Sequence, residues 1–112
     1  MVSSYCPRRG DVVWLTFTPQ AGHEQAGHRP ALTLSPDEYN QRAGLALFCP
    51  MTTKSKDYPF EVPISGTKAA GVVLADQVKC LDWRARGARF YFQADDSVVQ
   101  EVLEKLGVLL AS

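Results

Sequence analysis

The sequence predicts a mostly β fold, a small antiparallel barrel or strongly bent sheet that ends in a helix. Many short apolar or alternating segments lie along the chain, and Gly, Pro or polar residues bound them. Helical spacing of apolar residues extends over several turns only near the C-terminus. The length of 112 residues suits one domain, and 46% hydrophobic residues suffice for one core. We therefore expect a single domain over residues 1–112.

The first two strands are expected to flank a long polar loop. Residues 11–17 are β-branched and aromatic and follow Gly10, which is typical of a strand. Residues 18–28 are rich in polar residues and predict the loop. A second short strand is expected at 30–35.

A short helix and a central strand are expected next. Ser35-Pro36-Asp37-Glu38 combines an N-cap residue, a proline at the first helical position and acids in the first turn. Gly44 must end this helix soon. The continuous apolar run 45–49 predicts a central strand, and the polar stretch 52–58 predicts a loop.

The remaining strands are expected in the C-terminal half. Residues 60–64 alternate, but Pro63 lacks a backbone N–H and predicts an edge strand. Residues 65–70 predict a turn. Further extended segments are expected at 71–75, 76–81 and 89–92.

The C-terminal helix follows Asp95-Asp96-Ser97, which can cap it. Its apolar positions recur at helical spacing and are Val98, Val99, Val102, Leu103, Leu106, Leu109 and Leu110. Glu101, Glu104 and Lys105 lie on the opposite face. The pattern favours a helix that packs on the core over one that binds a partner.

Composition and charge narrow the class of protein. No apolar run reaches the roughly 18–20 residues of a membrane span, and no signal-peptide core follows Arg8 and Arg9, so a cytoplasmic protein is expected. Cys6, Cys49 and Cys80 have neither paired nor zinc-site spacing and predict free thiols. The net charge is zero, but residues 1–94 carry 11 basic and 8 acidic residues, an excess of +3. This excess is compatible with a polyanionic ligand and equally with solvated basic residues.

Candidate chemical groups gather on two loops and at one strand end. Glu24, His28 and Arg29 lie on the first loop, and Asp76 and Gln77 end a strand. The second loop carries Thr52, Thr53, Lys54, Ser55 and Lys56. Phosphate-loop, H-E-x-x-H and nucleophile-elbow motifs are absent from the sequence. The groups present suit metal-free cleavage of an RNA phosphodiester, in which the 2′-hydroxyl is the nucleophile and the protein supplies proton transfer and donors to the phosphorane oxygens.

Each of these residues also has a structural interpretation. The first loop resembles an ordinary solvated hairpin loop, in which Arg29 pairs with Glu24. Thr52 could pack in a turn, and Gln77 could cap its strand. Trp14 and Trp83 could stack on bases, although a strand tryptophan usually belongs to the core.

Seven segments together resemble the MazF/PemK family of toxin endoribonucleases, most closely its MazF branch. They are Gly10-Asp11-Val12-Val13-Trp14, Glu24-Gln25-Ala26-Gly27-His28-Arg29-Pro30-Ala31, Leu34-Ser35-Pro36, Pro50-Met51-Thr52-Thr53-Lys54-Ser55-Lys56, Tyr58-Pro59-Phe60-Glu61-Val62, Leu74-Ala75-Asp76-Gln77-Val78-Lys79 and Trp83-Arg84-Ala85-Arg86-Gly87. They cover residues 1–88 in order. The residues after Gly87 resemble the family by pattern, and His23 stands where the motif usually has Ser.

The resemblance implies an SH3-like, mostly antiparallel barrel with short helices, usually a homodimer. It implies a sequence-specific endoribonuclease that cleaves single-stranded RNA without metal or cofactor and thereby inhibits translation. The products would be a 2′,3′-cyclic phosphate and a 5′-hydroxyl. A MazE-type antitoxin would hold the enzyme inactive by laying an extended segment over the RNA groove.

The resemblance places the catalytic roles on Arg29, Thr52 and Glu24. RNA contacts are expected from His28, Thr53, Lys54, Lys56, Asp76, Gln77 and Arg86. Two alternatives stay open: a non-enzymatic gyrase-poisoning toxin of the CcdB type, which would lack the Arg and Thr pair, and a peptide-binding SH3-like module.

Overall fold

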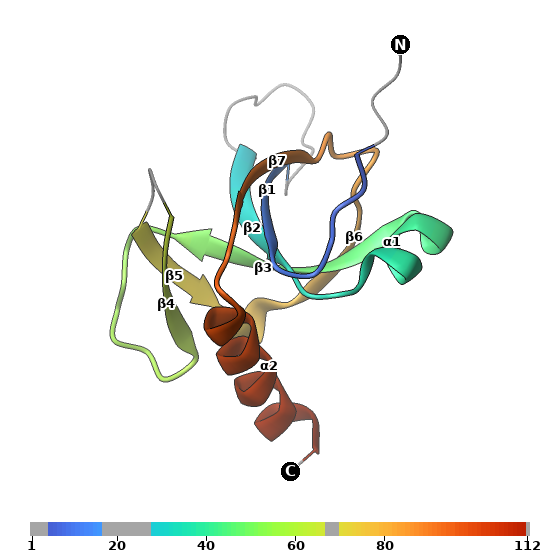
Figure 1. Cartoon of the computed structure of the whole chain (residues 1–112). Helices are drawn as coiled ribbons and strands as arrows, with labels where there is room; N and C mark the ends of the chain where they lie inside the picture. The colour runs from blue at the N-terminus through green and yellow to red at the C-terminus, as the bar shows by residue number, and fades with distance from the viewer. Residues whose placement is uncertain (1–4, 17–27, 67–69, 112) are drawn as a thin grey trace.

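The computed structural model describes residues 5–16, 28–66 and 70–111. They form a curled antiparallel sheet with two α-helices and a short 3-10 helix (Figure 1). The strands are β1 (Asp11–Thr16), β2 (His28–Thr33), β3 (Leu45–Thr52), β4 (Glu61–Ser65), β5 (Ala70–Leu74), β6 (Lys79–Asp82) and β7 (Arg89–Gln93). The helices are α1 (Asp37–Ala43), the 3-10 helix η2 (Ala75–Gln77) and α2 (Asp96–Ala111). The mostly β prediction is confirmed.

The strand order is β4-β5-β3-β2-β1-β7. β6 lies off this path and pairs with the first half of β3, whereas β5 pairs with the end of β3. Every strand pair is antiparallel. β3 is therefore the central strand, as its apolar run predicts. β4 lies at an edge, as expected from Pro63.

Several element boundaries differ from the sequence-based prediction, and three of these differences lie close to the candidate site. β2 begins at His28 instead of residue 30, because Thr16 and Leu15 of β1 pair with His28 and Arg29. β3 extends to Thr52 instead of ending at 49, because β5 pairs with its last residues. Residues 75–77 form a 3-10 helix where an extended segment was expected from residue 76.

Two groups of buried side chains fill the two sides of the curled sheet. One contains Val12, Leu32 and Val73 together with Val99, Val102 and Leu106 of α2. The other contains Val13, Leu15 and Phe48 and encloses Trp83. α2 therefore packs on the core, as predicted, but its apolar stripe continues beyond the core: Leu109 and Leu110 are 47% and 79% exposed.

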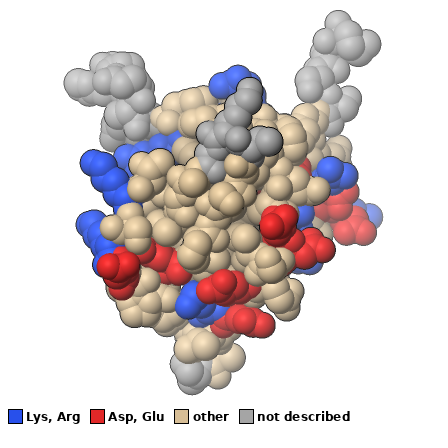
Figure 2. Space-filling view, turned by 60° about the vertical axis from the view of Figure 1, so that its left-hand side comes forward, with Lys and Arg blue, Asp and Glu red and all other residues tan. Residues whose placement is uncertain are grey.

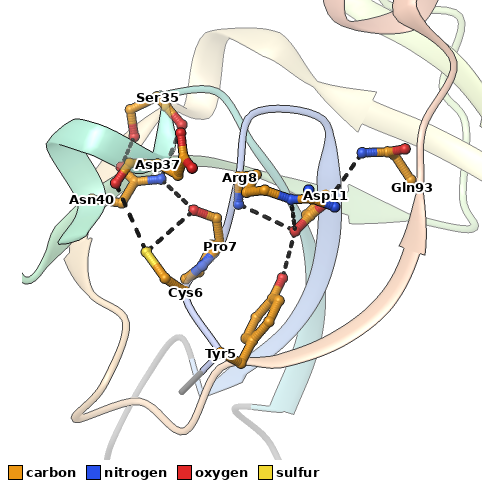
Figure 3. A network of polar contacts seen from close by, with 9 residues as sticks. All are labelled: Tyr5, Cys6, Pro7, Arg8, Asp11, Ser35, Asp37, Asn40 and Gln93. Atoms are coloured by element: carbon orange, nitrogen blue, oxygen red, sulfur yellow. Dashed lines mark hydrogen bonds and ion pairs between the residues drawn. The ribbon is translucent and has the colours of Figure 1, made fainter. Parts of the chain in front are cut away.

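The N-terminal segment is fixed by a polar network around two buried side chains (Figure 3). The carboxylate of Asp11 accepts hydrogen bonds from the Tyr5 hydroxyl at 2.7 Å and the Arg8 amide at 3.1 Å. Burial and this carboxylate raise the pKa of Tyr5 above its ordinary value. The Asn40 amide donates to the carbonyls of Pro7 and Ser35. Ser35 thus serves this network, and no side chain caps the start of α1, in contrast to the prediction.

No helix in the part of the chain that the structure describes is long and apolar enough to cross a membrane.

Candidate active site

A groove lined by strand and loop residues consists of two adjoining hollows. The first, of about 620 Å³, is lined by Trp14, Arg29, Pro30, Met51, Thr52, Thr53, Lys54, Ala70 and Tyr91. The second, of about 530 Å³, is lined by Arg29, Thr52, Lys54, Lys56, Tyr58, Glu61, Leu74 and Gln77. Arg29, Thr52 and Lys54 line both hollows and mark their junction. We call the whole the Arg29–Thr52 groove.

Among the described residues, the β3–β4–β5 side of the molecule carries charged side chains of both signs and no large patch of one sign (Figure 2). In Figure 2, which turns the β3–β4–β5 side of Figure 1 toward the viewer, basic and acidic side chains are interspersed over a mainly uncharged surface. On this face, interspersed charges of both signs produce little net field at a distance, so the basic groups that line the groove are the ones expected to attract a polyanion.

Thr52 is positioned by the contact between β3 and β5. Its Cα partner is Val72, and the neighbouring Gly71 lets the two backbones approach closely. The Thr52 hydroxyl oxygen accepts a hydrogen bond from the Lys54 amide at 3.2 Å. An accepting hydroxyl retains its own proton for donation. Thr52 can therefore donate to a group in the groove while it shapes the start of the next loop.

Arg29 stands on β2, opposite Leu15 of β1. Its side chain is exposed, and no acidic residue of the described segments forms an ion pair with it. A strand backbone thus presents a guanidinium to the groove at the same place as the Thr52 hydroxyl. Glu24 and His23 lie outside the described residues, so the pairing of Arg29 with Glu24 stays an untested alternative.

The β3–β4 loop, residues 53–60, carries both groove lysines and is organised by Glu61. One carboxylate oxygen of Glu61 accepts from the Ser55 hydroxyl at 2.7 Å, and the other accepts from the Lys56 amide at 2.9 Å. These bonds lower the pKa of Glu61 below its ordinary value. Asp57 has a φ of 56°, a left-handed conformation that a non-glycine residue adopts at some cost. The loop conformation is therefore held by specific contacts.

Asp76 holds the same loop from the other side. The Tyr58 hydroxyl donates to Asp76 Oδ2 at 2.8 Å, and this carboxylate raises the pKa of Tyr58. The Ala75 amide donates to the Phe60 carbonyl at 2.9 Å. Asp76 Oδ1 is buried and has no hydrogen-bond partner among the described residues. Asp76 thus anchors the loop beside the groove, whereas its neighbour Gln77 is exposed and lines the groove.

Two other predicted RNA contacts lie at different distances from the groove. His28 stacks on Trp14, with ring centroids 5.7 Å apart and planes 4° from parallel. Arg86 lies outside the groove and donates to the Thr16 carbonyl at 2.8 Å. The structure brings Thr53, Lys54, Lys56 and Gln77 to the groove, places His28 beside it and leaves Arg86 outside it, at the C-terminal end of β1.

The two tryptophans differ in environment. Trp83 is 5% exposed and its indole N–H donates to the Asn40 carbonyl at 3.0 Å, so it is a core residue. Trp14 is half-buried and lines the groove. Sequence reasoning did not single out Tyr91, Tyr58 or Glu61 as groove residues. Only the aromatic run at 90–92 could have drawn attention to Tyr91.

Within the described segments, no group of three or more His, Cys, Asp or Glu side chains is arranged to hold a metal ion. The chemistry of the groove is instead that of a guanidinium, two ammonium groups, hydroxyls and an amide, all of which donate hydrogen bonds to anionic oxygens.

Over residues 8–110, the chain matches the family of PemK-like, MazF-like toxins of type II toxin-antitoxin systems. The chain belongs to this family. The match extends beyond residues 1–88, so the C-terminal strand and helix belong to the family domain as well.

Relatives of known activity and structure support this membership. The endoribonuclease toxin MazF of Escherichia coli K12 is 51% identical over 110 residues, which cover 98% of this chain and 99% of the relative. The crystal structure of MazF from Deinococcus radiodurans is 52% identical, covers 97% of this chain and 100% of its own, and superposes with a TM-score of 0.87. A crystal structure of MazE–MazF from the same organism is 53% identical, covers 96% and 97%, and has a TM-score of 0.88. The enzyme class predicted for this chain is thus confirmed through its MazF relatives.

Proposed function

We propose that this MazF-family toxin cleaves single-stranded RNA at specific sequences in the Arg29–Thr52 groove, without a metal ion. The observation that carries the proposal is that Arg29 from β2 and Thr52 from β3 line the same groove, with Lys54 at their junction. A guanidinium and a hydroxyl that meet in this way are suited to a phosphate with developing negative charge.

The proposed reaction is an internal transfer at the scissile phosphate. The 2′-oxygen of the RNA forms a bond to phosphorus, the bond from phosphorus to the 5′-oxygen breaks, and the products are a 2′,3′-cyclic phosphate and a 5′-hydroxyl. A base takes the 2′-hydroxyl proton, and an acid protonates the departing 5′-oxygen. Arg29 and Thr52 donate to the non-bridging oxygens. By the family resemblance, Glu24 falls on the motif acid and is one candidate for this base, whose identity the resemblance leaves open.

The other residues predicted to contact RNA take different parts of the bound strand. Lys54 and Lys56 neutralise phosphates, and Thr53 and Gln77 donate to bases or sugar. His28 lies beside the groove, Asp76 acts through the loop that it anchors, and Arg86 meets RNA only beyond the groove. In the cell, cleavage of messenger RNA in the cytoplasm would inhibit translation.

One experiment separates this function from its alternatives. The purified protein is incubated with a long single-stranded RNA in EDTA, and the cuts are mapped by primer extension. We expect defined cuts, 5′-hydroxyl ends and 2′,3′-cyclic phosphates, and no cut where the nucleotide before the scissile bond is 2′-deoxy. A gyrase-poisoning toxin or a peptide-binding module would leave the RNA intact, and cleavage of the 2′-deoxy site would exclude the 2′-hydroxyl as nucleophile.

We also propose that two copies of the chain associate through an apolar surface formed by α1, β3 and α2. A hollow of about 600 Å³ there is lined mainly by apolar side chains, among them Tyr39, Leu47, Val78, Leu103 and Leu110. Tyr39, Leu47 and Leu110 are 43%, 39% and 79% exposed. Contiguous exposed apolar surface is typical of an interface. Light scattering should show a dimer that Leu110→Glu weakens, and a wild-type monomer would refute the proposal.

A MazE-type antitoxin is the proposed inhibitor, since the similar MazF of Deinococcus radiodurans crystallised with MazE. We infer that an acidic, extended antitoxin segment occupies the Arg29–Thr52 groove, where Arg29, Lys54 and Lys56 attract RNA and acidic peptide alike. Such a peptide should compete with RNA, and less well as salt rises. Inhibition with unchanged RNA affinity would show that the antitoxin acts elsewhere.

A further inference from the structure

One wall of the Arg29–Thr52 groove is aromatic. Trp14 of β1 and Tyr91 of β7 both line the groove next to Arg29 and Thr52. Their ring centroids lie 4.9 Å apart with planes inclined at 36°. Both side chains are half-buried, so each ring retains surface toward solvent. The groove thus has an aromatic wall immediately beside its cationic junction.

A β-bulge places Tyr91 in this wall. Phe92 pairs with Val12 and Phe90 with Val13, so the two neighbouring valines of β1 face a three-residue stretch of β7 with Tyr91 as the extra residue. A bulge redirects side chains relative to a regular strand, and bulges are common beside active sites. Without it, continued pairing from Phe92 would place Tyr91 opposite Val13, on the other face of the sheet from Trp14.

Polar groups flank the aromatic pair. The His28 ring stacks on Trp14, and Arg89 Nη2 donates to His28 Nε2 at 3.3 Å. Arg89 is the β7 residue paired with Trp14, and both Arg89 and His28 are exposed. Hydrogen-bonding and cationic groups therefore border the aromatic surface, as they do in sites that stack a nucleobase and contact its phosphate.

We propose that Tyr91 and Trp14 form a stacking subsite for one unpaired nucleobase of the RNA, next to the phosphate that Arg29 and Thr52 contact. The proposal rests on the proposed RNA cleavage and adds a specific place for a base adjacent to the cut. A base that is paired and stacked in a duplex cannot reach this surface, so the subsite also accounts for a preference for single strands.

The subsite can be tested by combining a change in the protein with a change in the RNA and measuring whether the effect of one depends on the other. A cleavable RNA is prepared in a series in which one nucleotide near the cut at a time is abasic. Each RNA is cleaved by wild type, Tyr91→Leu and Tyr91→Phe. At one position the abasic change should lower the kcat/KM of wild type and of Tyr91→Phe roughly tenfold or more, the size expected for loss of one base stack. The same change should have no further effect on Tyr91→Leu.

Additive effects of the abasic change and Tyr91→Leu at every position would overturn the subsite. The failure of the subsite remains distinguishable from failure of the proposed function, because the latter would leave intact RNA uncut by wild type.

A second measurement avoids any variant that fails to fold. An RNA with a 2′-deoxy nucleotide at the cut carries 5-iodouracil at one position at a time and is irradiated in complex with wild-type protein. Crosslinks should map to Tyr91 or Trp14 from the position identified by the abasic series. Their absence from both rings at every position would also overturn the proposal.

Discussion

The carbonyl oxygen of Thr52 lies where a side chain on Gly71 would have to be. A Cβ atom built on Gly71 would stand 2.3 Å from this oxygen and 3.1 Å from its carbon, and both atoms belong to the backbone. Glycine at position 71 is therefore what allows β5 to pair so closely with the end of β3 that carries the Thr52 hydroxyl.

Gly71→Ala should displace Thr52 and reduce RNA cleavage strongly. Because a backbone group cannot rotate away, the added methyl must push the end of β3 outward, at a cost of about 1–3 kcal/mol in stability. Denaturant unfolding and single-turnover cleavage measure the two effects. Gly107→Ala is the stability control, since nothing lies within 4 Å of its added Cβ and helix propensity should raise stability by about 1 kcal/mol. Unchanged cleavage by Gly71→Ala would show that the β3–β5 approach does not position Thr52.

Arg29→Ala should abolish most cleavage and leave the fold intact. The side chain is exposed, so little packing is lost, whereas loss of one preorganised donor to the phosphate lowers the rate by about 10²–10³. Cleavage rate and thermal unfolding are compared with wild type, and Arg42→Ala, an exposed arginine on α1, serves as the control. A folded Arg29→Ala protein that cuts at nearly the wild-type rate would remove Arg29 from the site.

Thr52→Val should lower the single-turnover rate more than the affinity for RNA. The change keeps the volume but removes a donor that acts on the phosphorane oxygens in the transition state. It also removes the acceptor for the Lys54 amide, so the β3–β4 loop should exchange its amide hydrogens faster. Thr52→Ser retains the hydroxyl and should recover most of the rate. Equal losses of rate and affinity would indicate a packing or binding role.

Glu61→Gln should raise the KM for RNA through the position of Lys54 and Lys56. A glutamine replaces one acceptor oxygen with an NH2 group and carries no negative charge, so it cannot accept from the Ser55 hydroxyl and the Lys56 amide through two separate oxygens as Glu61 does. Hydrogen exchange at residues 55–58 should accelerate, and ionic contact with RNA should weaken. Glu104→Gln, on the exposed face of α2, is the matched control. Unchanged exchange in that loop would contradict the role of Glu61.

The carboxylate of Glu61 also predicts that the β3–β4 loop loses stability only at acid pH. Because folding lowers the pKa of Glu61, its contribution to stability is fully present above the ordinary carboxyl value of 4.5 and is lost as the pH falls through the lower, folded value. Loop exchange in wild type should therefore be constant near neutral pH and increase only under acid, and the increase should be smaller in Glu61→Gln.

Local patterns in the sequence predicted most of the elements. Nearest-neighbour preferences and periodicity, which a linear sequence displays directly, predicted the first strand, the short helix before Gly44, the edge strand with Pro63 and the C-terminal helix. Arg29 and Thr52 stood out by their motifs. The chain matches the family that those motifs indicated, and their catalytic roles remain predictions.

Tertiary structure alone decided how these residues meet. Pairing with β1 and β5 extended β2 to His28 and β3 to Thr52, because a strand ends where its partner strand ends rather than where its own pattern does. The bulge at Tyr91, the close approach at Gly71 and the loop contacts of Glu61 and Asp76 join segments distant in sequence or depend on register. Residue type marks a side chain that could bind or react, but only the register of distant strands determines which side chains share a groove.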